Sequence, residues 1–174
     1  MIKTFKENDE VLYPNEDFVC VSKEDLTLLK QLADKNVRKR VRLCIHKNPN
    51  ERLQEMFIVH TKECFVRPHY HINKPESLYV IEGMADLIIF NKFGKIKKVV
   101  ELSCNTNDGF IFHRQDAGTI HMIIIKSDYF IFHEVTEGPF RRADTIFPQW
   151  APEGNLISDN LFIKNLNLKQ LKFE

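Results

Sequence analysis

The sequence lacks an excess of charge of either sign, a long apolar run and a paired cysteine motif. Its 25 Lys and Arg residues are balanced by 24 Asp and Glu residues, which leaves a net charge of +1. Without a cationic field to hold a phosphate backbone, nucleic acid is not an expected partner. The longest apolar runs, such as residues 122–125, fall far short of the roughly 20 residues that a membrane span needs. The first residues also lack the apolar segment of a secretory signal, so we expect a cytoplasmic protein with no membrane partner.

The four cysteines are spread along the chain. Cys20, Cys44, Cys64 and Cys104 are separated from one another by 20 or more positions. No pair therefore has the CxxC spacing that holds zinc or carries dithiol chemistry. We expect free thiols that are mostly buried.

One amphipathic helix and a series of short strands account for most of the chain. Ser22 is a typical N-cap residue, Asp25 stands at the capping-box position, and apolar residues then recur at helical spacing, which predicts a helix over residues 23–36. Beyond residue 40, short apolar stretches separated by Pro, Gly, Asn or Asp indicate antiparallel strands. The clearest expected strands are residues 77–82, 85–91, 96–102, 109–113, 121–126 and 129–135. Loops at 91–94 and 126–128 are expected to join neighbouring strands as hairpins.

Several of these strands are apolar on both faces, which favours a sheet closed on itself over a flat sheet with one wet side. We therefore expect an all-β jelly-roll barrel preceded by a short helix. The expected segments are an N-terminal arm and helix at 1–39, the barrel at 40–154 and an extension at 155–174 that packs on the barrel or on a second subunit. Apolar residues in this extension and at both chain ends predict a homodimer.

Four side chains of metal-binding type are placed so that a closed barrel would bring them together. His69 and His71 are two residues apart in an expected strand, so their imidazoles lie on one side, about 7 Å apart along the backbone. Glu76 opens the next strand, and His121 follows a turn at Gly118. Three imidazoles and one carboxylate form the donor set of an open divalent-metal site, with about two positions of an octahedron left for water or substrate. Any one histidine alone is more often structural, so the prediction depends on their combined spacing.

Three further residues are candidates for substrate contacts. Arg67 has the same strand parity as His69 and can bind a carboxylate or phosphate, or can pair with a structural acid. Arg42 shares one expected strand face with Arg40 and His46, which makes either a second anion contact or a solvated face. Tyr79 can donate its hydroxyl to a ligand or fill the barrel.

The same residues carry a resemblance to a known family. His69-x-His71-x4-Glu76-x6-Gly83 has the spacing of the first cupin motif, and Gly118-x2-His121 matches the metal-binding end of the second. Residues 24–154 most resemble the WbuC-like cupins, through segments 42–46, 66–71, 134–140 and 150–154. The resemblance implies a double-stranded β-helix barrel. It also implies one divalent ion of manganese, iron, nickel or zinc near the mouth, held by the three histidines and Glu76.

The sequence departs from the cupin pattern at four positions. Glu63 replaces the glycine that often opens the first motif, and Gly109 opens the second motif one residue early. Asp116 replaces the proline of the second motif, and Ile125 replaces its trailing asparagine. None of these changes removes a metal donor, but Asp116 makes the loop before His121 more polar and less rigid than proline would.

WbuC-like proteins are associated with clusters that build bacterial surface polysaccharide such as O-antigen. The resemblance therefore implies a metal-dependent cupin that acts on a sugar or sugar nucleotide, as an isomerase or epimerase in which the metal stabilises an enediolate-like charge. Two alternatives stay open, because the fold does not select a reaction. One is a non-catalytic cupin that binds metal or sugar. The other is a metal-free ketoisomerase of deoxysugar nucleotides, with His69 and His71 as acid and base.

Overall fold

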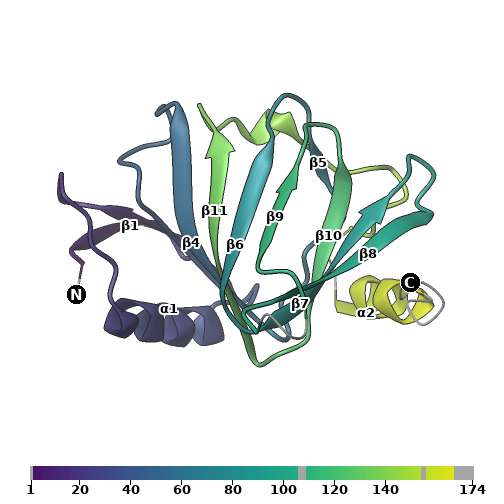
Figure 1. Ribbon diagram of the computed structural model, residues 1–174, viewed down its shortest axis with the longest axis horizontal. Coiled ribbons are helices and arrows are strands. Elements are labelled where there is room, and N and C mark those ends of the chain that lie inside the picture. Colours follow the sequence, from purple (N-terminus) through teal and green to yellow (C-terminus); the bar gives the residue numbers. More distant parts are fainter. Residues whose placement is uncertain (1, 106–108, 154–155, 167–174) are drawn as a thin grey trace.

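Two facing β-sheets with a helix on the outer side of each make up the fold, as seen in the computed structural model (Figure 1). The structure describes residues 2–105, 109–153 and 156–166. In chain order the elements are β1 (Thr4–Asn8), β2 (Val11–Pro14), α1 (Lys23–Lys35), β3 (Arg40–Cys44), β4 (Leu53–Thr61), β5 (Tyr70–His71), β6 (Glu76–Glu82), β7 (Met84–Phe90), β8 (Ile96–Ser103), β9 (Phe112–Gln115), β10 (Ile120–Ile125), β11 (Tyr129–Glu137), the 3-10 turn η1 (Arg142–Asp144), β12 (Thr145–Ile146) and α2 (Leu156–Asn165).

The strand order is that of a jelly roll. The larger sheet runs β1-β2-β3-β4-β11-β6-β9, and all its pairs are antiparallel except β2 with β3. The opposite sheet runs β10-β7-β8, and the short pair β12-β5 joins it through a bridge between His69 and His121. A second bridge, between Leu102 and Phe110, links β8 to the segment before β9. The expected all-β, double-stranded β-helix barrel with an N-terminal helix is confirmed.

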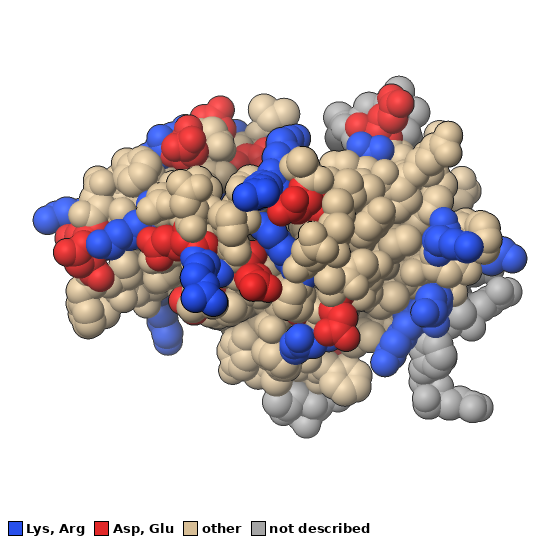
Figure 2. Space-filling model, turned by 90° about the horizontal axis from the view of Figure 1, so that it is seen from above, with Lys and Arg blue, Asp and Glu red and all other residues tan. Residues whose placement is uncertain are grey.

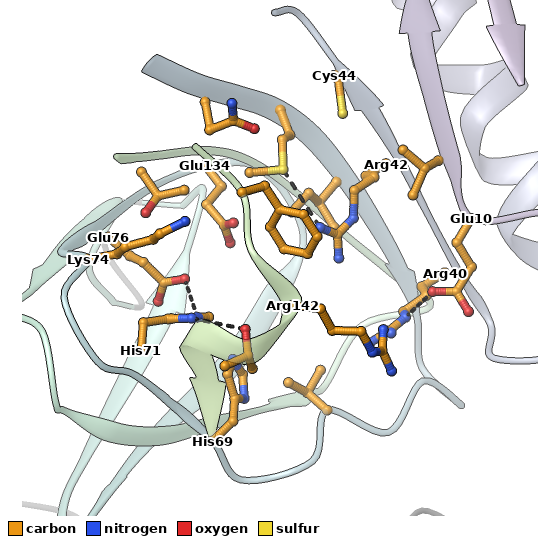
Figure 3. A pocket seen from close by; sticks show the side chains of 18 of the residues that line it. Glu10, Arg40, Arg42, Cys44, His69, His71, Lys74, Glu76, Glu134 and Arg142 are labelled. Carbon is orange, nitrogen blue, oxygen red and sulfur yellow. Dashed lines mark hydrogen bonds and ion pairs between the residues drawn. The ribbon is translucent and has the colours of Figure 1, made fainter. Parts of the chain in front are cut away.

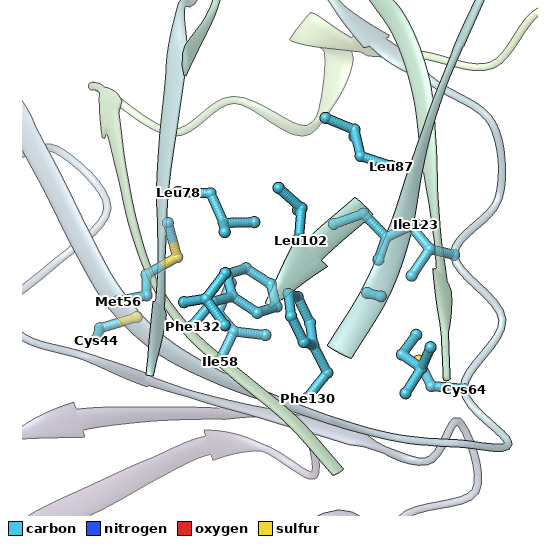
Figure 4. Close-up of a cluster of buried hydrophobic side chains, with 14 of the residues drawn as sticks. Cys44, Met56, Ile58, Cys64, Leu78, Leu87, Leu102, Ile123, Phe130 and Phe132 are labelled. Atoms are coloured by element: carbon cyan, nitrogen blue, oxygen red, sulfur yellow. The ribbon is translucent and has the colours of Figure 1, made fainter. Parts of the chain in front are cut away.

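The main core lies between the sheets (Figure 4). Phe130 and Phe132 of β11 point into it, whereas Ile131 between them points outward and packs against a second cluster that includes Leu29 and Ala33 of α1. Successive strand residues face opposite sides of a sheet, so an apolar residue at every position means that both faces are covered. Here the barrel interior covers one face and α1 covers the other.

The helix α1 begins and ends where the sequence predicts. The Ser22 hydroxyl accepts a hydrogen bond from the Asp25 backbone N–H at 3.2 Å, and the Asp25 carboxylate accepts one from the Ser22 backbone N–H at 2.9 Å. The same carboxylate accepts a hydrogen bond from the Ile2 backbone N–H at 2.9 Å, so the cap also fixes the start of the chain. Asn36 forms the C-cap.

The second helix, α2, packs on the outer face of the smaller sheet. Its Phe162 ring stacks on Trp150 with ring centroids 6.2 Å apart, and Trp150 in turn contacts Phe90 of β7. The helix and the one residue after it account for residues 156–166 of the expected extension. The rest of that extension, residues 155 and 167–174, lies outside the described residues.

Two local expectations differ from the structure. Residues 91–94 do join the paired strands β7 and β8, but residues 126–128 connect β10 to β11, which belong to different sheets. Ser127 stabilises this connection between the sheets. Its hydroxyl accepts a hydrogen bond from the Met84 backbone N–H at 2.8 Å and donates one to the Tyr129 carbonyl at 2.6 Å. The strand expected at 109–113 is displaced to Phe112–Gln115, which places Gln115 beside Glu76 in register.

The distribution of surface charge and the burial of the cysteines can be compared with the expectations from the sequence. On the face shown in Figure 2, basic and acidic side chains are interspersed over the surface. All four cysteines are free, with Cys44 and Cys64 buried as expected but Cys20 and Cys104 exposed. Among the described residues, no helix combines the length and the apolar character that crossing a bilayer requires.

Candidate metal centre and ligand cavity

The barrel brings together the four side chains that the sequence predicts as metal ligands. His69 and His121 lie directly opposite each other and exchange two backbone hydrogen bonds, of 3.0 and 2.9 Å. Their ring centroids are 4.5 Å apart, and the His71 ring lies 5.2 Å from His69 and 6.4 Å from His121. Glu76, the first residue of β6, reaches into this group from the larger sheet. The cluster therefore joins both sheets at one end of the barrel.

Each imidazole is oriented by an oxygen at its Nδ1 atom. His69 Nδ1 lies 2.8 Å from the Arg67 carbonyl, and His121 Nδ1 lies 3.0 Å from the Thr119 carbonyl. A carbonyl can only accept, so the neutral His69 ring carries its proton on Nδ1 and keeps a lone pair on Nε2, whereas His121 Nδ1 also lies 2.9 Å from the Gln115 amide nitrogen. His71 Nδ1 lies 3.2 Å from the Thr145 hydroxyl. Oxygen partners at the second ring nitrogen are the usual support of histidines that bind metal.

The Nε2 atoms of two histidines meet the Glu76 carboxylate. His71 Nε2 lies 2.8 Å from Glu76 Oε1, and His121 Nε2 lies 3.4 Å from Glu76 Oε2 (Figure 3). The Gln115 amide nitrogen donates to Glu76 Oε2 at 2.7 Å and lies 3.1 Å from His121 Nε2. Gln115 was not predicted from the sequence. Its role follows from the β6-β9 register, which no local pattern reveals.

Burial and the charges of neighbouring residues shift the pKa values of this cluster, and the direction differs from residue to residue. Burial and the adjacent His121 lower the pKa of His69 to about 3. Burial alone would lower the pKa of His71, but its hydrogen bond to Glu76 raises it above the ordinary value. Burial alone would raise the pKa of Glu76, yet the His71 hydrogen bond and the nearby histidines lower it to about 2. These directions favour a charged His71 paired with the Glu76 carboxylate and a neutral His69.

Three imidazoles and one carboxylate are suitable ligands for a divalent ion, and oxygen contacts at the Nδ1 atoms hold the imidazoles in place. Within the described residues, however, no group of three or more His, Cys, Asp or Glu side chains is arranged around a single ion position. Glu76 instead contacts the Nε2 atom of His71, and Gln115 contacts the Nε2 atom of His121. Metal binding would require the Glu76 carboxylate to turn from His71 and His71 to lose its Nε2 proton.

The cluster lines one end of a cavity of about 630 Å³. Cavities of roughly 300–1,000 Å³ suit small organic ligands, so the space exceeds what an ion and its waters need. Two of the three predicted substrate-contact residues line it, namely Arg67 and Arg42. Arg67 donates to the Ala151 carbonyl at 3.2 Å, and its guanidinium lies 4.4 Å from the Phe147 ring centroid.

Tyr79 does not line the cavity, which corrects its expected position. It is 47% exposed on β6, between Leu78 and Val80, which are buried in the core. Strand parity explains the difference, since Glu76, Leu78 and Val80 face inward and the residue between two of them must face outward.

Among the cavity residues that were not predicted from the sequence are Lys74, Glu134, Arg142 and Thr145. Glu134 comes from the centre of β11, and burial together with Glu76 raises its pKa to about 7. Thr145 and Arg142 come from the segment after the barrel strands, which returns to pair with β5. Neither residue belongs to a periodic pattern or a motif, so no sequence signal pointed to them.

Comparison with known proteins supports the fold and leaves the activity open. A family model described as a domain of unknown function (DUF6016) matches residues 21–102. No curated protein sequence matches the chain. The crystal structure of protein SO0799 from Shewanella oneidensis is 11% identical and matches 64% of this chain and 75% of its own, with a TM-score of 0.52.

Two further solved structures are similar at lower scores. A Klebsiella pneumoniae protein with a double-stranded β-helix domain is 15% identical over 67% of this chain and 94% of its own, with a TM-score of 0.49. The capsular polysaccharide assembling protein CapF from Staphylococcus aureus is 15% identical over 62% of this chain and 31% of its own, with a TM-score of 0.48. At such identities the likeness concerns the barrel fold alone.

Proposed function

We propose that this chain is a metal-binding cupin of the WbuC-like type that acts on a sugar or sugar nucleotide in the assembly of bacterial surface polysaccharide, in the cytoplasm. The observation that carries the metal assignment is the orientation of the histidines. His69 donates Nδ1–H to a backbone carbonyl, which leaves a lone pair on its Nε2 atom, and His121 Nδ1 lies 3.0 Å from a second carbonyl. His71, held at Nδ1 by Thr145, completes the set.

When bound, a divalent ion would supply Lewis acidity that stabilises negative charge on a substrate carbonyl or hydroxyl oxygen. The chain supplies the surroundings. Glu134 faces the same cavity with a pKa raised to about 7, so its carboxyl group can give or take a proton near neutral pH. The Arg67 guanidinium lines the cavity 4.4 Å from the Phe147 ring, where it can orient a polar group of the substrate. An isomerisation or epimerisation requires this combination of charge stabilisation and proton transfer.

A metal-free ketoisomerase is the second candidate, and the contact between His71 and Glu76 favours it. The pKa of His71 is raised by Glu76, and the pKa of His69 is lowered by burial, so the two adjacent imidazoles differ in their affinity for a proton. A charged imidazole and a neutral one are the acid and base that such an isomerisation needs. A non-catalytic cupin would use the same cluster for binding only.

Metal analysis separates these candidates. Protein purified without chelator and reconstituted with manganese, iron, nickel or zinc should hold close to one ion per chain. His69→Ala and His121→Ala should each lower that content, because each removes one donor. His133→Gln is the matched control, since His133 lies on β11 and is not among the residues that line the cavity. If wild-type protein holds no metal after reconstitution, the metal assignment is wrong and the acid/base isomerase becomes the leading candidate.

We also propose a homodimer. The larger sheet ends in the edge strands β1 and β9, and exposed aromatic residues lie next to or within β9, with Phe110 65% and Phe112 54% exposed. A second copy that extends this sheet would cover both the open edge and these rings. Light scattering should give twice the chain mass, and a monomer mass at all concentrations would contradict the proposal.

A further inference from the structure

A cluster of arginines lines the cavity wall away from the histidines. Arg40 and Arg42 are two residues apart on β3, so they project from the same face of the strand. Arg142, from η1, lines the same cavity, and in the view of Figure 3 its side chain ends beside that of Arg40, whereas the Arg42 guanidinium is separate from both. Arg38 flanks the cluster. Two separate elements therefore bring guanidinium groups to one end of the cavity.

Most acidic residues that line this cavity are paired with groups other than Arg42 and Arg142. Glu10 pairs with both Arg40, at 2.9 Å, and Arg38, at 3.2 Å. Asp9, Glu76 and Asp144 contact Lys6, His71 and Lys74. In the part of the chain that the structure describes, Arg42 and Arg142 form no ion pair, and the one hydrogen bond of the Arg42 side chain goes to the Met56 sulfur at 3.8 Å. The guanidinium groups of Arg42 and Arg142 therefore keep donors for an anion.

In the described part of the chain, three buried side-chain nitrogens of cavity residues have no hydrogen-bond partner, and one of them is Arg67 Nε. His60 Nδ1 and His46 Nε2 have no hydrogen-bond partner, although each residue is only 6% exposed and lines the cavity. His60 lies directly opposite Arg40 in the β3-β4 register. Leaving a buried polar group unpaired costs about 1–3 kcal/mol, and native proteins contain few such groups. A polar ligand in the cavity would give these nitrogens a partner.

The number and type of donors favour a phosphate over a carboxylate. Guanidinium groups bind carboxylates and phosphates through two parallel hydrogen bonds. A carboxylate has two oxygens and is satisfied by one guanidinium in this way. A phosphate group offers more oxygens and more charge, and it can use guanidiniums that approach from two directions. Arg142 comes from η1 and Arg40 and Arg42 come from β3, so guanidinium groups of two elements are available, which suits the larger anion.

We propose that Arg40, Arg42 and Arg142 bind the phosphate group of a phosphorylated sugar, whose sugar ring extends toward His69, His71 and Glu76. The sugar half of this assignment rests on the proposed function, whereas the phosphate half rests on the arginines alone. Both a sugar monophosphate and the diphosphate of a nucleotide sugar carry the required group. The cavity of about 630 Å³ is continuous between the arginines and the histidines, as one ligand spanning them requires.

Isothermal titration calorimetry tests the proposal with four probes: inorganic phosphate, glucose 1-phosphate, uridine diphosphate and glucose. Wild-type protein should bind at least one of the three phosphates at millimolar concentration or better, and more weakly as salt is added. Arg42→Gln and Arg142→Gln should each weaken that binding tenfold or more. Arg52→Gln is the matched control, because Arg52 is exposed and outside this cavity, and it should bind as wild type does.

The outcomes are distinct. A preference for glucose 1-phosphate supports a monophosphate substrate, and a preference for uridine diphosphate supports a nucleotide sugar. Absence of phosphate binding in wild type, or unchanged binding in folded Arg42→Gln and Arg142→Gln proteins, overturns the proposal. Arg142 is exposed, so its variant should fold even if the Arg42 variant does not. Metal content measured on the same samples tests the proposed function separately, since neither arginine belongs to the metal donor set.

Discussion

Acid stability should depend strongly on His60. Burial, followed by the charges of Arg40, Arg42 and Arg38, lowers its pKa from 6.5 to about 3, and the residue is only 6% exposed. The unfolded chain therefore takes up a proton near pH 6.5, whereas the folded chain resists until about pH 3. The contribution of His60 is fully present above pH 6.5 and is lost as the pH falls toward 3. Between pH 7.5 and 5.0 the loss amounts to about 2 kcal/mol from this residue.

Urea unfolding followed by circular dichroism at these two pH values, in phosphate-free buffer with chelator, measures the effect. His60→Gln should lose about 2 kcal/mol less than wild type between pH 7.5 and 5.0, because glutamine does not titrate. Ile58→Val is the control from the same strand, since it lowers the free energy of unfolding by about 1 kcal/mol at both pH values. An identical pH-dependent loss in His60→Gln and wild type would refute the reasoning.

Four further results are expected. Gly83 has a φ of +86° and an added Cβ would lie 2.1 Å from the Tyr129 carbonyl oxygen, so Gly83→Ala should cost about 3 kcal/mol in thermal unfolding. Gly118→Ala, with a φ of +78° and no atom within 4 Å of the added Cβ, should cost only about 1 kcal/mol. Ser22→Ala should lower the free energy of urea unfolding by about 1 kcal/mol, because it removes the cap of α1. Free metal at about 100 times its dissociation constant should stabilise wild type by about 2.7 kcal/mol, measured as a melting shift, and should stabilise His69→Ala less.

The fold could be predicted because its signals are local. Ser22, Asp25 and the apolar repeat mark the helix without reference to the rest of the chain. The regular spacing of short apolar strands likewise predicts a barrel. The connection at Ser127 was predicted as a hairpin, because a short polar turn has the same sequence pattern whether its two strands pair or belong to different sheets. The convergence of His69 and His121 depended on barrel closure, which the motif spacing anticipated.

The rest of the site could not be predicted, because it depends on which strands become neighbours. Gln115 reaches Glu76 through the β6-β9 register, and the outward position of Tyr79 is set by the residue parity of β6. Arg142 and Thr145 reach the cavity because an irregular segment folds back over it. The placements of Gln115, Arg142 and Thr145 have no local pattern in the sequence, whereas strand parity counted from Glu76 would have placed Tyr79 on the outer face.

That returning segment, residues 142–146, touches both ends of the cavity. Thr145 holds His71, Asp144 lies 3.5 Å from Lys74, and Arg142 belongs to the arginine cluster three residues earlier. A ligand that immobilises Arg142 would therefore also restrict the residue that orients a histidine. If binding of an anion changes the metal affinity through this segment, thermodynamic linkage requires that binding of the metal changes the anion affinity by the same factor.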